Sequence, residues 1–395
     1  MNNKKKVCIS FGIVVILLIC LFFINISKAD NSIETIQFSD KQMYLAVLNQ
    51  IQNEYDITFD NATNTINIIN TDLERIEKLE LNNNNISNIS GIEKFTNLQE
   101  LNISNNNIKD ITKLQTLTNL RTLKAFCNTI SNTSAVSGLV DLKYLDLSKN
   151  KLDDSNRTKD NCLTTNLSNL TNLKELNLSH NYLIYISGIE NLTVLESLNL
   201  YDNAICDIQG IGNLTSLVTL KLGENNEFSR YTISGVSEIS SLTNLKYLDF
   251  SENKTSDIIS SISGLTNLEY LSLEGNNIVN LTGIENLYKL KVLNLYSNKI
   301  VDISKLYELQ DLKELILQEN SIKNITGMIQ NNELVWPEMK KLYIHLNQVD
   351  LIIISFEKIC IWQINKTKQF HFNWKKTIRR RACHSKLFGF IFLIN

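Results

Sequence analysis

The apolar positions of this chain recur in one fixed frame, L-x-x-L-x-L-x-x-N-x-I. The frame occurs twelve times, mostly at a spacing of 22 residues. Regular spacing of this kind predicts one supersecondary unit per copy, stacked along a common axis so that neighbouring copies share a core. The asparagines of the frame are Asn84, Asn106, Asn128, Asn150, Asn181, Asn203, Asn225, Asn253, Asn276, Asn298, Asn320 and Asn347.

The first half of each copy predicts a short strand that ends in a turn. In the second copy, Leu101 and Ile103 alternate with polar residues. Alternation with a period of two indicates a strand with one buried face. Asn106 follows where the chain must turn. Its amide carries an acceptor and two donors, so we expect the frame asparagines to be buried and to satisfy backbone groups that the turn leaves unpaired.

The second half of each copy predicts a different backbone. Its apolar residues are spaced by three, as in Ile108, Ile111 and Leu114, which suits a 3-10 or irregular convex side. A period of 20–29 residues with this frame is typical of the leucine-rich repeat. We therefore predict an α/β solenoid, a leucine-rich-repeat horseshoe with short parallel strands on its concave face. Strands about 4.8 Å apart give a sheet on the order of 50 Å long.

Four copies are longer than the rest, with 31, 28, 23 and 27 residues. Extra residues in a solenoid form surface loops. The first insertion, 151–162, is polar and charged, and the second contains 227–231. Both are candidate recognition loops, and solvent-exposed loops without a binding role are the alternative. The long copies start at Leu142, Leu217, Leu245 and Leu312.

The N-terminus has the layout of a signal peptide. Three lysines precede an apolar run over 7–24, and Ser27 and Ala29 frame a small-x-small cleavage site. We predict a signal peptide over 1–29, with cleavage after Ala29. The apolar run is long, so an uncleaved membrane anchor is the alternative, and a membrane is expected as a partner only in that case.

Residues 30–75 do not follow the repeat. Ser39 and Asp40 precede apolar residues at helical spacing, from Met43 to Ile51. This arrangement predicts a helix with a capped start. Residues 56–69 are expected to be extended. The first copy needs its open end covered, so we assign 30–75 to a helical N-terminal cap and 76–349 to the repeats.

The pattern stops after Val349. Residues 350–395 contain nine Lys or Arg residues, two acidic residues and several aromatic clusters. A basic, aromatic segment for anionic surfaces is one interpretation of this tail. A shifted reading frame that replaced the native C-terminal sequence is the other, and the abrupt change in composition favours it.

The predicted body of the protein is acidic. The chain has 39 basic and 41 acidic residues; the leader holds four basic ones, and the tail holds nine basic and two acidic ones. Residues 30–349 therefore contain 26 basic and 39 acidic residues, a net charge of about −13. A surface of this sign argues against a nucleic-acid ligand and favours basic partners or cations.

No motif for catalysis or for a cofactor occurs in the sequence. Nucleophile-elbow, zinc-protease, phosphate-loop and calcium-loop spacings are all absent, so we predict a protein that is not an enzyme. Cys360, His371, Cys383 and His384 lack the close pair typical of a zinc site, and no metal is predicted. The cysteines left after the leader are odd in number and scattered, which does not indicate a disulfide framework. They are Cys127, Cys162, Cys206, Cys360 and Cys383.

The concave face is the predicted site of binding. The third, fifth and seventh residues of the frame should point outward from the sheet, and many of them are aromatic. Tyrosine on a rigid sheet suits a protein interface, although it is also a good strand residue. Because three successive copies carry Tyr247, Tyr270 and Tyr296, we expect their rings to form one patch. The full set of candidate partner-binding residues is Tyr247, Tyr270, Tyr296, Ile316, Tyr343, Tyr201, Phe126 and Tyr144.

The chain resembles the internalin-type leucine-rich-repeat proteins of Gram-positive bacteria. The resemblance rests on 22-residue copies such as 268–284 and on the segments 36–40 and 73–81, which are similar to the N-terminal cap of that family. It implies a secreted or surface-held module that binds a host or neighbouring protein through its concave face. The wall-sorting motif of the family is absent, since Pro337 is the sole proline. The alternative function is the recognition part of a larger enzyme or toxin whose catalytic domain is missing from this chain.

Overall fold

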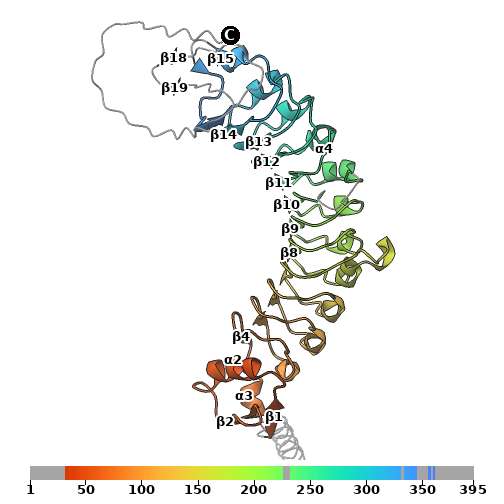
Figure 1. Ribbon diagram of the computed structural model, residues 1–395, viewed down its shortest axis with the longest axis vertical. Helices are drawn as coiled ribbons and strands as arrows, with labels where there is room; N and C mark the ends of the chain where they lie inside the picture. The colour runs from red at the N-terminus through yellow and green to blue at the C-terminus, as the bar shows by residue number, and fades with distance from the viewer. Residues whose placement is uncertain (1–31, 226–231, 331–332, 345–354, 357–358, 361–395) are drawn as a thin grey trace, which may run out of the picture.

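The computed structural model describes residues 32–225, 232–330, 333–344, 355–356 and 359–360. The predictions for the leader, for most of the tail and for the 227–231 loop lie outside the described residues. The described chain forms an arc, with strands along its inner side and short helices along its outer side (Figure 1). The predicted leucine-rich-repeat solenoid is therefore confirmed.

Twelve strands form one parallel sheet in the order β17-β14-β13-β12-β11-β10-β9-β8-β7-β6-β5-β4. Each strand pairs in register with the strand of the next coil, so equivalent frame residues lie side by side, as Leu220 and Leu248 do. The strands are β4 (Lys78–Glu80), β5 (Glu100–Asn102), β6 (Thr122–Lys124), β7 (Tyr144–Asp146), β8 (Glu175–Asn177), β9 (Ser197–Asn199), β10 (Thr219–Lys221), β11 (Tyr247–Asp249), β12 (Tyr270–Ser272), β13 (Val292–Asn294), β14 (Glu314–Ile316) and β17 (Lys341–Tyr343).

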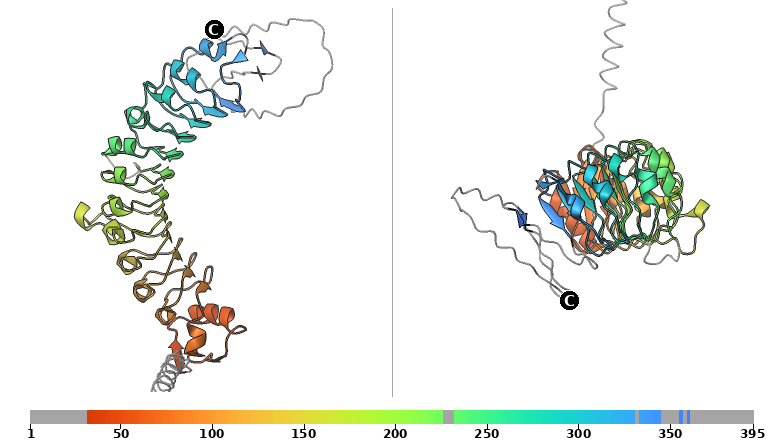
Figure 2. Two further views of the ribbon diagram at one scale, coloured as in Figure 1. Left: turned by 180° about the vertical axis from the view of Figure 1, so that it is seen from behind. Right: turned by 90° about the horizontal axis from the view of Figure 1, so that it is seen from above.

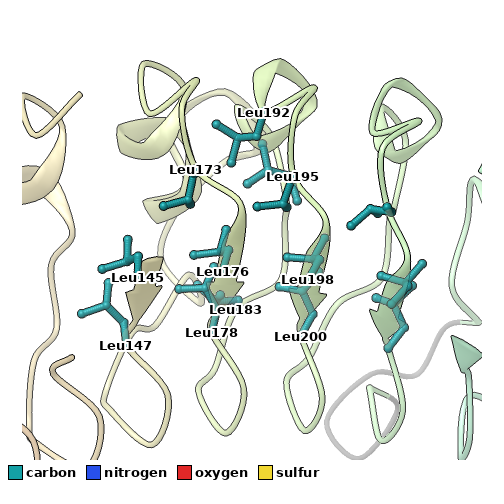
Figure 3. Close-up of a cluster of buried hydrophobic side chains, with 14 of the residues drawn as sticks. Leu145, Leu147, Leu173, Leu176, Leu178, Leu183, Leu192, Leu195, Leu198 and Leu200 are labelled. Atoms are coloured by element: carbon teal, nitrogen blue, oxygen red, sulfur yellow. The ribbon is translucent and has the colours of Figure 1, made fainter. Parts of the chain in front are cut away.

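The core is a continuous leucine stack between the sheet and the convex side. Figure 3 shows Leu176 and Leu198 from neighbouring strands facing the same interior as Leu173 and Leu195. These side chains are fully or almost fully buried. Burying one leucine stabilises a fold by about 1.5–3 kcal/mol, and each coil contributes several such residues to the stack. Stacking therefore supplies the core that no single coil has.

The convex side consists mainly of 3-10 turns, as the three-residue spacing predicted. One coil departs from this pattern, with a five-residue α-helix, α4 (Ile258–Ile262), in the 23-residue copy that starts at Leu245. The turns are η1 (Ile92–Lys94), η2 (Thr112–Thr116), η3 (Ser134–Val136), η4 (Lys159–Asn161), η5 (Leu163–Leu167), η6 (Ile189–Asn191), η7 (Ile211–Asn213), η8 (Val236–Ser241), η9 (Ile284–Asn286), η10 (Ser304–Glu308) and η11 (Thr326–Met328).

An antiparallel sheet and a helix precede the first coil. The sheet has the order β1-β3-β2, from β1 (Ile33–Gln37), β2 (Ile57–Asp60) and β3 (Thr65–Ile69). Helix α2 (Lys41–Ile51) buries its apolar side and contacts β4, and the one-turn helix α3 (Asn70–Leu73) leads into the repeats. The predicted helix and the predicted extended segment are both present, while the boundaries of the cap stay a prediction. The remaining short strands are β15 (Ile329–Gln330), β16 (Glu333–Leu334), β18 (Ser355–Phe356) and β19 (Ile359–Cys360).

The frame asparagines join neighbouring coils through their side-chain amides. Asn203 is 1% exposed; its Nδ2 donates to the carbonyl oxygens of Leu178 and Leu200, both at 3.1 Å. Its Oδ1 accepts the N–H of Leu183 at 3.1 Å. The same contacts recur along the stack, as predicted. Asn84, which has no earlier coil to join, is only half-buried.

The residue before each frame asparagine has a left-handed backbone, which the frame alone did not predict. Its φ lies between 51° and 64° from Asn83 to Glu319. The N–H of this residue continues the sheet beyond the strand, as when Glu224 donates to the Ser251 carbonyl oxygen at 2.9 Å. Side chains at this position therefore follow one another along the edge of the concave face.

Candidate binding surface

The sheet places the predicted binding residues in three separate rows. Tyr144, Tyr247 and Tyr270 occupy the third frame position, and Ile316 pairs with Tyr343 at the fifth. The third row holds the seventh-position residues Phe126, Tyr201 and Tyr296. All eight side chains are half-buried, which leaves part of each side chain on the surface.

Tyr247 and Tyr270 form the closest aromatic pair on this face. They lie opposite each other in the β11–β12 register, and their ring centroids are 4.1 Å apart with the planes within 2° of parallel. Lys221 Nζ lies 5.4 Å from the centroid of the Tyr247 ring. Burial raises the pKa of both hydroxyls above the ordinary value, so both phenols stay neutral at physiological pH. The pair is an uncharged aromatic platform with a cation beside it.

Tyr296 does not join this platform, and the prediction of a single three-ring patch is wrong. Opposite Tyr270 the next strand presents Val292, and Tyr296 lies four residues further along that coil. The Tyr296 hydroxyl donates to Glu319 Oε1 at 2.7 Å, and this bond with burial raises its pKa to about 12. The sequence spacing placed all three residues on the outward face but in different rows.

Ion pairs between coils neutralise the side of the sheet where the strands start. Lys174 Nζ lies 2.7 Å from Glu196 Oε1, and Lys341 Nζ lies 3.0 Å from Glu314 Oε2. Lys291 is paired with Glu269 in the same way. Solvent screens these surface pairs, so each contributes little to stability. The local effect is a balanced charge pattern along this edge.

The opposite side, where the strands end, is acidic. Glu224, Glu252 and Glu274 come from three successive coils, and we call them the acidic row. Glu252 donates its backbone N–H to the Glu274 carbonyl oxygen at 2.7 Å, which sets the two residues side by side. Among the described residues, no ion pair includes a member of this row. The composition predicted the negative sign of the body but not the position of these three glutamates in one row.

The first insertion lies away from the concave face. It projects from the convex side of the arc, where it is drawn in yellow in Figure 1 and in the left view of Figure 2. Asp154, which is 0% exposed, anchors it by accepting the N–H groups of Leu163 at 2.9 Å and Ile184 at 3.3 Å. Burial raises the pKa of this carboxyl. Lys159 Nζ is also tied to Asp207 at 2.5 Å.

No group of three or more His, Cys, Asp or Glu side chains in the described part of the chain is arranged to hold a metal ion. Within the same residues, no helix has the length and apolar character needed to cross a membrane.

The parallel sheet, the buried asparagines and the 3-10 convex turns define a leucine-rich-repeat protein. Models of this repeat match residues 74–116 and 266–308 as pairs of copies, and residues 236–278 and 172–192 in addition. The chain is similar to an internalin, inlF, of Listeria monocytogenes, with 26% sequence identity over 80% of this chain and 96% of that one, and a TM-score of 0.51. In its repeats and in this overall similarity the chain resembles the internalin-type leucine-rich-repeat proteins.

Two further solved structures are similar at the same level of identity. A leucine-rich-repeat protein of Leptospira interrogans is 26% identical over 71% of this chain and 75% of that one, with a TM-score of 0.57. The ectodomain of the Arabidopsis receptor kinase HAESA, solved with a peptide hormone ligand, is 26% identical with a TM-score of 0.52. This chain covers 42% of that ectodomain. A comparison with curated protein sequences found no match.

Proposed function

We propose that this protein is a secreted or cell-surface binding module that recognises a host or neighbouring protein through the concave face of its solenoid. The leader-like N-terminus and the similarity to an internalin support export. The similarity to a receptor ectodomain that was solved with a peptide supports a polypeptide ligand. The sheet is a rigid support, because every strand is held by its neighbours and by the asparagine contacts.

The observation that carries the proposal is the Tyr247–Tyr270 stack. Two rings 4.1 Å apart on paired strands present a flat, partly exposed surface outside the buried core of the solenoid. Tyrosine offers a large contact area and loses little conformational entropy when it binds. Ile316, Tyr343, Tyr201, Phe126, Tyr144 and Tyr296 extend this surface in both directions along the arc. We place the centre of the interface at the stack because interface energy concentrates in such aromatic anchors.

The test begins with capture of a partner by the immobilised protein from the surface proteins of neighbouring or host cells. The affinity of the purified partner is then measured for the wild type and for Tyr247→Ala/Tyr270→Ala. We expect a loss of at least about thirtyfold, since an anchor contributes about 2 kcal/mol and 1.4 kcal/mol corresponds to tenfold. The melting temperature should change little, because neither ring belongs to the buried core.

The matched control removes two tyrosines elsewhere. Tyr182 and Tyr288 are 40% and 53% exposed and lie outside the concave strands. The variant Tyr182→Ala/Tyr288→Ala should bind within about threefold of the wild type. If the control loses binding while the stack variant keeps it, the interface lies on the convex side or at the first insertion, and the concave-face proposal is rejected.

A further inference from the structure

The charge on the concave face is divided between its two edges. Where the strands start, each of three lysines, including Lys174 and Lys341, faces a glutamate on the next or the preceding coil. Where the strands end, the acidic row of Glu224, Glu252 and Glu274 has no cation in any of the ion pairs found among the described residues. Folding thus uses the charges where the strands start internally, whereas in these three coils the carboxylates of the acidic row have no ion-pair partner among the described residues.

The carboxylates of the acidic row lie close enough for their charges to repel one another. Glu252 lies between Glu224 and Glu274, and the backbone bonds of the extended ladder hold the three coils together. Burial first, and then the charges of Glu274 and Glu224, raise the pKa of Glu252. The Glu252 carboxylate also lies over Gly275, where an added Cβ would be 2.0 Å from Oε1. A third negative group is therefore held near two others, and the charge of Lys254 on the same coil offsets only part of the repulsion.

Two of the three carboxylates already accept hydrogen bonds from neutral donors. Tyr201 donates its hydroxyl to Glu224, and Asn294 donates to Glu274 Oε2 at 2.7 Å. These bonds fix the direction of the two side chains but do not neutralise them. An incoming cation would meet oriented carboxylates and would relieve the repulsion in the row, which is the condition for electrostatic complementarity at an interface.

The acidic row and the tyrosine stack belong to the same coils. Tyr247 shares its coil with Glu252, and Tyr270 shares its coil with Glu274, four or five residues further on. At about 3.3 Å per residue this separation is at most roughly 13–17 Å, because the chain turns after each strand, and it lies within the reach of one extended peptide segment. Asp249 lies between the two and adds to the negative side. The position of Lys221 against the Tyr247 ring shows that this stack accepts a cation beside it.

We propose that the polypeptide bound on the concave face presents a basic, extended segment, whose Lys or Arg side chains lie along Glu224, Glu252 and Glu274 while its apolar side chains contact the Tyr247–Tyr270 stack. This inference rests on the proposed function and specifies the chemistry of the partner. Three carboxylates spread over three coils suit several cations carried on one chain. In the described residues no group of side chains converges to hold a single metal ion.

The test uses a labelled 12-residue peptide of alternating lysine and serine, with an alternating glutamate and serine peptide for comparison. Fluorescence anisotropy at low ionic strength measures their binding to the full chain and to Glu224→Gln/Glu252→Gln/Glu274→Gln. We expect the lysine peptide to bind the wild type at least about tenfold more tightly than the variant, since each exposed charge pair contributes up to about fivefold. The glutamate peptide should not bind, and added salt should abolish the difference.

The control variant, Asp141→Asn/Glu308→Asn/Asp311→Asn, removes the same number of charges from exposed positions away from the row. It should retain lysine-peptide binding within about twofold. A second variant, Glu252→Lys, guards against misfolding of the triple variant, because it changes one exposed side chain and should also reduce binding. Equal binding by the row variant and the control variant, or no binding to the wild type, would overturn the inference.

These outcomes are separate from those of the proposed function. A captured partner that is lost from Tyr247→Ala/Tyr270→Ala but retained by the triple glutamine variant would keep the concave-face function and reject a basic segment. A partner indifferent to both variants would reject both proposals.

Discussion

The side chain of Gln50 in α2 bonds to the backbone of Glu80 in the way that a neighbouring strand would. Gln50 Nε2 donates to the Glu80 carbonyl oxygen at 2.7 Å, and Gln50 Oε1 accepts the Glu80 N–H at 2.8 Å. Glu80 belongs to β4, the first strand of the sheet, which has no preceding coil. The side chain of α2 thus satisfies backbone groups of an edge strand, which otherwise is a template for pairing with other chains.

The first prediction concerns this contact. Gln50→Ala should lower the free energy of unfolding by about 1 kcal/mol, the typical value of hydrogen bonds that water can partly replace. Gln115→Ala, at an exposed position of η2, should change it by less than about 0.5 kcal/mol. Urea denaturation followed by circular dichroism measures both. Equal shifts for the two variants would mean that the Gln50 pairing does not stabilise the first coil.

The second prediction concerns Asp40, which caps α2 and docks it on the first coil. Its Oδ1 accepts the Gln42 N–H at 2.7 Å, and its Oδ2 accepts the N–H and the hydroxyl of Ser87, each at 2.7 Å. Burial raises the pKa of Asp40, but the bonds from Ser87, Met43 and Asn88 outweigh it and lower the pKa overall. Because the pKa of Asp40 is lower in the folded state, its carboxylate stabilises the fold at pH values above the unfolded-state pKa of about 3.9. This stabilisation is lost as the pH falls through the folded-state pKa.

Asp40→Asn should therefore melt at a lower temperature than the wild type at pH 7. The difference should narrow as the pH falls below about 4, because the wild-type carboxyl then becomes protonated as well. Asp311→Asn, at an exposed position, should match the wild type throughout. Melting curves of the wild type and both variants between pH 7 and pH 3 test this prediction. A difference in melting temperature between Asp40→Asn and the wild type that stays constant with pH would contradict the role of the charge.

The third prediction separates a frame asparagine from a surface one. Asn203→Ala should lower the free energy of unfolding by about 1–3 kcal/mol, because the Leu183 N–H and two carbonyl oxygens lose their buried partner. Asn213→Ala, at an exposed position of η7 in the following turn, should have an effect below about 0.5 kcal/mol. Urea melts of the two variants provide the measurement. Comparable losses would show that the amide ladder is not what holds the coils together.

The fourth prediction concerns the first insertion. Asp154→Ala leaves the buried N–H of Leu163 without its acceptor and should cost about 1–3 kcal/mol. It should also increase the rate at which a protease cleaves within 151–162, since the anchor of that loop is lost. Asp160→Ala changes an exposed residue of the same loop and should behave like the wild type. If limited proteolysis does not distinguish the two variants, other contacts hold the insertion.

The frame was sufficient to predict the coil because each of its residues has one physical role. Leu101 and Ile103 can be buried only on one side of a strand, and the Asn106 amide matches the unpaired groups of a tight turn. Since every copy repeats the same local solution, the parallel sheet and the core follow by stacking. The helix that begins after Asp40 was predictable for a similar local reason, the capping residue before apolar positions.

The arrangement of the surface depended on contacts between coils, which the frame does not encode. Sequence spacing put Tyr247, Tyr270 and Tyr296 on the outward face, but register decided that the first two stack and that Val292 stands opposite Tyr270. The charges around Glu252 likewise depend on which residues the neighbouring coils bring beside it, as Glu224 and Glu274 show. The sequence by itself determined the coil, its buried side and the sign of its charge, because these follow from the local period and composition. Only the tertiary structure decided which outward residues meet, because side chains far apart in the chain become neighbours through the stacking of coils.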